Sequence, residues 1–66
     1  MNVHVNDETR EFPDGSSVAD VLAELGAARR GVAVALDGEV VRRGDWTATA
    51  VPDGARLEIL TAVQGG

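Results

Sequence analysis

The residues of this chain best suited to chemistry are the last two, Gly65 and Gly66, which end it in a terminal carboxylate. Two residues without a Cβ can enter a channel that is too narrow for any side chain, and their backbone can adopt angles closed to other residues. A carboxylate at neutral pH does not acylate anything until it is activated, for example as a mixed anhydride with a nucleotide. The glycine pair therefore predicts a terminus that another enzyme activates. The simpler interpretation is a frayed chain end.

Length and composition restrict what the rest of the chain can do. A 66-residue chain predicts a single domain, residues 1–66, with no room for a deep pocket. Its net charge of −5 disfavours binding to nucleic acid and suits basic protein partners, or simply keeps the protein soluble. We expect no catalytic residues and no bound metal, because the chain has no Cys and one His.

The same composition bears on the compartment. The absence of Cys fits a reducing cytoplasm. No apolar run approaches the roughly 20 residues of a membrane span, and no segment has the pattern of a signal peptide. We therefore expect a cytoplasmic protein that has no membrane partner.

The beginning of the chain predicts a β-hairpin. Polar and apolar residues alternate over residues 2–6, which places Val3 and Val5 on the core face of a strand. Asn6-Asp7 suits a tight turn into a second strand over residues 9–12. His4 falls on the polar face, where we expect an ordinary solvated side chain.

A short helix should follow this hairpin. Ser17 and Asp20 have the spacing of a capping box, in which Asp20 replaces the usual Glu or Gln. Gly26 is placed to end the helix, which gives an element over about residues 18–25. Its apolar residues recur at the spacing of one helical face, and they are Val18, Val21, Leu22 and Leu25.

The second half of the chain predicts another hairpin and a crossing segment. Residues 32–36 are apolar throughout and are expected to form the middle strand of the sheet, with both faces partly covered. Asp37-Gly38 favours a type I′ turn into a strand over 39–42. Residues 42–51 show no regular period and predict an irregular crossing segment, in which Trp46 is expected to cover the edge of the core.

The final strand contains Leu57 and Ile59 in alternation with charged residues, but the apolar run then continues where polar residues were due. On a small protein this continuation predicts a docking surface beside the terminus. The alternative is that Leu60 belongs to the core because the strand is covered on both faces. The predicted docking residues are Leu60, Ala62 and Val63, with Arg42 and Trp46 as weaker candidates.

Hairpin, helix, hairpin, crossing segment and final strand is the element order of the β-grasp fold. This is an α+β, ubiquitin-like architecture with one main helix across a mixed sheet of about five strands. Residues 32–41 and 57–66, together with Trp46 and Asp53-Gly54, resemble the sulfur carrier proteins of thiamine biosynthesis, the ThiS family. The resemblance spans nearly the whole chain and is most specific over residues 61–66. We expect residues 62–66 to form a flexible C-terminal tail.

The resemblance implies a specific chemistry for the terminus. An adenylating, E1-like enzyme would use ATP and Mg²⁺ to convert the Gly66 carboxylate into an acyl adenylate, so that this chain itself binds no cofactor. A sulfur donor such as a cysteine desulfurase would then supply the sulfur of a thiocarboxylate on Gly66. Gly65 and Gln64 would enter the active sites of the partners. Thiazole synthase would accept the sulfur.

Other functions share the glycine ending. A carrier for molybdopterin or cysteine synthesis would have the same fold, although Val63-Gln64 before the glycines favours thiamine. A ubiquitin-like modifier would be conjugated to lysines of target proteins. An interaction module would use the domain alone, without chemistry at the terminus.

Overall fold

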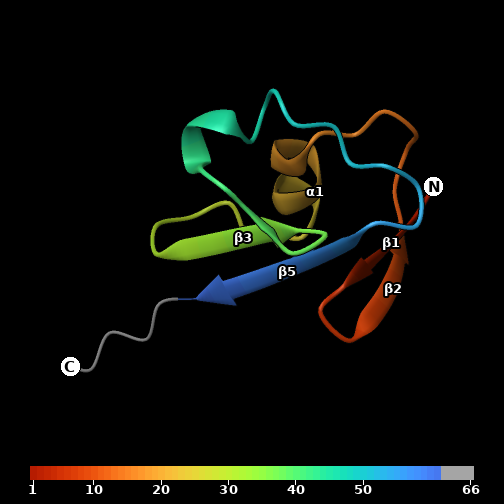
Figure 1. Ribbon diagram of the computed structural model, residues 1–66, viewed down its shortest axis with the longest axis horizontal. Helices are drawn as coiled ribbons and strands as arrows, with labels where there is room; N and C mark the ends of the chain where they lie inside the picture. The colour runs from red at the N-terminus through yellow and green to blue at the C-terminus, as the bar shows by residue number, and fades with distance from the viewer. Residues whose placement is uncertain (62–66) are drawn as a thin grey trace.

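A computed structural model describes residues 1–61 of the chain, which form one five-stranded sheet with a helix packed across one face (Figure 1). A short 3₁₀ helix lies in the crossing segment before the last strand. The elements are β1 (Asn2–Val5), β2 (Glu8–Glu11), α1 (Val18–Glu24), β3 (Val32–Leu36), β4 (Glu39–Val41), η1 (Arg43–Asp45) and β5 (Arg56–Thr61).

The strands are arranged in the order β2-β1-β5-β3-β4. β5 runs parallel to β1 and antiparallel to β3, so it joins the two hairpins into one mixed sheet. This topology, with α1 across the sheet, is the β-grasp fold expected from the sequence. The prediction that residues 32–36 form the middle strand was wrong. β5 occupies the centre of the sheet, and β3 lies one position from the edge. A run of apolar residues indicates that a strand is buried, but it does not indicate which strands pair with it.

Local sequence accounts for the helix. The Ser17 Oγ accepts from the amide of Asp20 at 3.1 Å, and the Asp20 carboxylate accepts from the amide of Ser17 at 3.0 Å, which confirms the capping box. Gly26 follows the last turn with φ +68. Its amide donates to the carbonyl of Ala23, and the next amide donates to that of Leu22, which is the Schellman arrangement.

Two tight turns fix the hairpin registers. Asp37 and Gly38 both have positive φ, 49° and 88°, as the predicted type I′ turn requires. In the first hairpin only Asn6 of the turn pair has a positive φ, 53°. The strand after it begins at Glu8 and ends at Glu11, one residue earlier than expected, and Phe12 turns into the core beyond its end.

The core lies between α1 and one face of the sheet. The predicted stripe of the helix supplies three fully buried side chains, and Leu25 is partly buried. The predicted packing role of Trp46 is confirmed: its side chain is 4% exposed, and its indole N–H donates to the carbonyl of Val41 at 3.0 Å. The largest fully buried side chains are Leu22, Leu57, Val3, Val18, Val21 and Val34.

The crossing segment is tied to the start of the helix. The amide of Val18 donates to the carbonyl of Thr49, and the amide of Val51 donates to that of Ser16. These bonds satisfy backbone groups that a helix start and an irregular segment would otherwise leave without partners. In the part of the chain that the structure describes, no helix has the length and apolar character needed to cross a bilayer.

Candidate functional site: the end of the central strand

The predicted reactive terminus follows directly on the central strand. β5 ends at Thr61, which is also the last residue that the structure describes. The predicted covalent site Gly66 and its neighbours Gly65, Gln64, Val63 and Ala62 therefore lie outside the described residues. The structure does show the surface from which this segment departs.

The end of β5 is held on both sides. On one side Thr61 pairs with Val32 and Leu60 with Ala33, so the antiparallel ladder with β3 continues to the last residue of the strand. On the other side, the paired residues of β1 end at Val5 opposite Leu57.

The Asn6 side chain continues that second side beyond the paired residues. Its Oδ1 accepts from the amide of Ile59 at 2.9 Å, and its Nδ2 donates to the carbonyl of the same residue at 3.4 Å. Sequence reasoning assigned Asn6 only a turn role. A contact between residues 53 positions apart in the chain leaves no signal in local sequence.

Leu60 lies on the face of the sheet opposite α1. It is 64% exposed, so the alternative that placed it in the core was wrong. It is opposite Ala33 on β3, and on the same face Ala35 is opposite Val40 on β4. Val40 is 79% exposed and was not singled out from the sequence, because adjacent valines at 40 and 41 do not reveal which one faces inward. We call Leu60, Ala33, Ala35 and Val40 the apolar patch.

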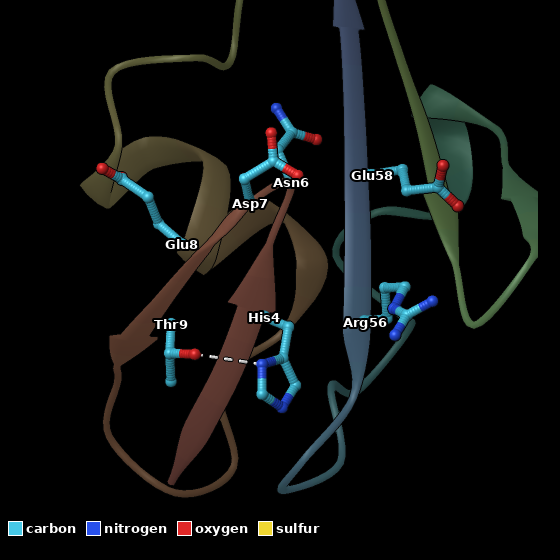
Figure 2. Close-up of a pocket in the computed structure, with 7 residues that line it drawn as sticks. All are labelled: His4, Asn6, Asp7, Glu8, Thr9, Arg56 and Glu58. Atoms are coloured by element: carbon cyan, nitrogen blue, oxygen red, sulfur yellow. Dashed lines mark hydrogen bonds between the residues drawn. The ribbon is translucent and has the colours of Figure 1, made fainter.

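The other half of the same face is polar. Figure 2 shows a shallow hollow in which His4 on β1 and Thr9 on β2 are joined by a hydrogen bond, 3.0 Å between Nδ1 and Oγ1, beside Arg56 and Glu58 on β5. His4 is exposed, as predicted. Within residues 1–61, no three His, Cys, Asp or Glu side chains are grouped so that they could hold a metal ion. This hollow offers hydrogen bonds, and the apolar patch offers contact area.

The two weaker docking candidates, Arg42 and Trp46, differ in exposure. Arg42 is exposed at the start of η1. Trp46 is buried, which removes its indole from the surface. Arg43, the first residue of η1, is exposed. Its guanidinium lies 4.5 Å from the centroid of the Trp46 ring.

The chain N-terminus lies at the opposite end of the molecule from the end of β5 (Figure 1). The Met1 amino group donates to the carbonyl of Phe12 at 2.8 Å and lies 3.0 Å from the Asp14 carboxylate. The hydrogen bond that this amine donates to Asp14 is the main cause that raises its pKa above the ordinary value of 8.0. The contacts of the N-terminal amine are therefore limited to the first hairpin and the turn that follows it.

Comparisons with known proteins agree with this geometry. Residues 3–66 match the model of the ThiS family. The crystal structure of the thiamine biosynthesis protein ThiS from Geobacter metallireducens is similar over the whole of both chains, with a TM-score of 0.85 and 35% sequence identity. A solution structure of a thiamine biosynthesis protein from the same organism has a TM-score of 0.79 and 36% identity, over all of this chain and 88% of the other.

Two relatives are similar in sequence over all 66 residues. The sulfur carrier protein ThiS of Escherichia coli is 27% identical, and the match covers both chains completely. A thiazole synthase of Paramagnetospirillum magneticum is 38% identical, but this chain spans only 20% of its length. The family match over nearly the whole sequence, together with the β-grasp topology, shows that the chain belongs to the ThiS family.

Proposed function

We propose that this protein is a sulfur carrier of thiamine biosynthesis that holds its sulfur on the carboxylate of Gly66. The observation that supports this most directly is the family match over residues 3–66, which includes the two terminal glycines. The fold supports it as well, because a well-held central strand leads straight into the segment that would carry the reactive group.

The chemistry takes place at the terminal carboxyl group of Gly66. The Gly66 carboxylate oxygen attacks the α-phosphate of ATP, and pyrophosphate leaves, which gives an acyl adenylate. The terminal sulfur of a persulfide donor then attacks the carbonyl carbon and displaces AMP. The acyl disulfide that results keeps the sulfur–sulfur bond of the persulfide. A thiol cleaves this bond and becomes part of a disulfide on the donor side, and the thiocarboxylate remains on Gly66. The protein is thus a substrate of other enzymes.

The proposed function requires three partners, two that load the sulfur and one that receives it. An adenylating enzyme would supply ATP and Mg²⁺, a sulfur donor such as a cysteine desulfurase would supply the persulfide, and thiazole synthase would receive the sulfur. The relative from P. magneticum supports the last of these, since a segment similar to this chain forms a fifth of a protein named thiazole synthase. All three steps would take place in the cytoplasm.

The described residues would serve recognition. The apolar patch lies on the outer face of the sheet and includes Leu60, one residue before β5 ends. A partner that covers Leu60 and Val40 would hold the domain at a fixed distance from its own active site. The glycines would then enter a channel too narrow for side chains.

Intact-mass spectrometry tests the proposal. The protein is incubated with the adenylating enzyme of the same organism, ATP, Mg²⁺ and a persulfide donor. We expect the mass to increase by the difference between sulfur and oxygen. A variant that lacks Gly66 should keep the wild-type melting temperature and gain no mass.

Two outcomes would contradict the carrier role. One is a wild-type protein that gains no mass although the enzyme and donor are active on another carrier. The other is a Gly66 deletion that still supports thiazole formation. A ladder of conjugates on lysines of other proteins would instead identify a modifier.

A further inference from the structure

The arginines of this acidic protein are unevenly distributed. Four of the six occur as two adjacent pairs, Arg29-Arg30 before β3 and Arg42-Arg43 after β4. The fold brings the two pairs together, because the Arg43 guanidinium donates a hydrogen bond to the carbonyl of Arg29. All four side chains are exposed. We call these four residues the arginine cluster.

The cluster lies at the end of the molecule where β5 ends. Arg30 is two positions before Val32, and Val32 is the partner of Thr61. Figure 1 shows the loop before β3, the 3₁₀ helix η1 and the arrowhead of β5 at the same end of the long axis. The last described residue of β5, Thr61, therefore lies at the end of the molecule that carries these four positive charges.

Internal packing explains only one member of the cluster. Arg43 stacks on the Trp46 ring and bonds to the Arg29 carbonyl, so it fixes the position of the loop. The ion pairs within residues 1–61 join Met1 to Asp14 and Arg10 to Glu8, so none engages the cluster. The flanking elements α1 and η1 carry three carboxylates, Asp20, Glu24 and Asp45, and Asp20 is engaged in the capping box at the start of α1, so the four arginines outnumber the carboxylates of these elements.

This local charge is opposite to the net charge of −5. A protein with that net charge must bring an anionic terminus to ATP, which is itself strongly anionic, and general repulsion opposes the approach. A positive surface at the end of β5 would orient the protein so that this end approaches an acidic partner first. An asymmetric charge distribution orients two proteins as they meet and raises their association rate. The expectation of a basic partner, drawn from the net charge alone, does not apply to this end.

We propose that Arg29, Arg30 and Arg42 dock on an acidic surface that borders the active-site entrance of the adenylating enzyme, with Arg43 as the residue that positions them. This inference rests on the proposed carrier function. The apolar patch would supply contact area on the adjoining face, and the cluster would set the direction of approach and its dependence on salt.

The test measures pyrophosphate release by the adenylating enzyme of the same organism, at carrier concentrations well below saturation. The variants are Arg30→Glu and Arg42→Glu. The matched control is Arg10→Glu, which makes the same change in charge on β2 at the far edge of the sheet. We expect the two cluster variants to be about tenfold slower than wild type near 20 mM salt and the control to stay within about twofold. The difference should shrink to about twofold near 200 mM salt, because exposed charges are screened.

Each other outcome overturns the inference. Equal slowing by Arg10→Glu would mean that only net charge matters. Wild-type rates for both cluster variants would mean that the cluster does not dock, while the carrier function would stand. Normal pyrophosphate release with slower sulfur transfer to thiazole synthase would move the surface to that partner. A wild-type protein that is not adenylated at all would remove the proposed function and this inference together. Melting temperatures of all variants should match wild type.

Discussion

Leu57 and Leu60 are three residues apart on the same strand and have opposite environments. Leu57 is 0% exposed against the helix side of the sheet, and Leu60 is 64% exposed on the other side. The inner face has α1 to cover it, while among residues 1–61 no element packs over the outer face. A small domain with a single helix can bury only one face of its sheet. The apolar side chains left on the outer face are therefore available for partners.

The largest expected effect comes from matched truncations of these two leucines. Leu57→Ala should lower the free energy of unfolding by about 2 to 5 kcal/mol, since it opens a cavity in a fully buried position. Leu60→Ala should change it by less than about 0.5 kcal/mol, because its side chain is mostly in water. Urea denaturation of both variants measures the difference. Equal destabilisation would mean that the outer face is covered in solution.

The outer face should matter for transfer and not for folding. Leu60→Asp places a charge in the apolar patch, and we expect adenylation at subsaturating carrier to slow about tenfold, because a contact that must lose water would then bury a carboxylate. Thr9→Asp adds the same charge to the polar half of the face and serves as the control. The melting temperature of both variants should remain that of wild type. Unfolding by Leu60→Asp, or an equal slowing by Thr9→Asp, would contradict a docking role.

The helix that covers the inner face depends on its capping box. Ser17→Ala removes the side-chain oxygen that accepts from Asp20, and we expect a loss of about 1 kcal/mol in the free energy of unfolding. Ser17→Thr retains the hydroxyl and should lose less. The midpoint of urea denaturation for the two variants checks this. A similar loss in both variants would contradict the assignment of the loss to the missing hydrogen bond, because Ser17→Thr retains the hydroxyl.

The smallest effect concerns the N-terminal amine. Its pKa is raised in the folded protein, mainly through Asp14, so the folded state holds this proton more tightly than the unfolded state. The stabilisation is fully present below the ordinary pKa of the amine and is lost as pH rises through the folded value. The chain has no Lys, Tyr or Cys, so no side chain of ordinary pKa titrates together with this amine just above its ordinary pKa of 8.0. Denaturation midpoints should fall slightly as the pH rises above 8 in wild type and stay flatter in Asp14→Asn.

Much of the fold could be predicted from short stretches of sequence. Ser17, Asp20 and Gly26 set the limits of the helix through bonds within a few residues of each, and Asp37-Gly38 set the hairpin turn through its own backbone angles. Local geometry decided these features, so the sequence carried their signal. The prediction of β3 as the middle strand failed, because the order of strands depends on pairings far apart in the chain.

The candidate site was less predictable. The apolar run through Leu60 fitted either a core strand or a docking surface, and only the absence of a covering element on the described outer face distinguishes them. Val40 and Asn6 were missed for related reasons, since register decides which valine faces outward and a distant strand receives the Asn6 side chain.

By itself, the sequence determined the two terminal glycines, the capped helix, the turns and the resemblance that relates the terminus to sulfur transfer. Tertiary structure decided the surroundings of that terminus. It placed Leu60 on an open face and joined two distant arginine pairs beside the end of β5, which gives an acidic protein a basic end. The physical reason is that local bonds act between neighbours in the chain, whereas exposure and electrostatic potential are sums over neighbours in space.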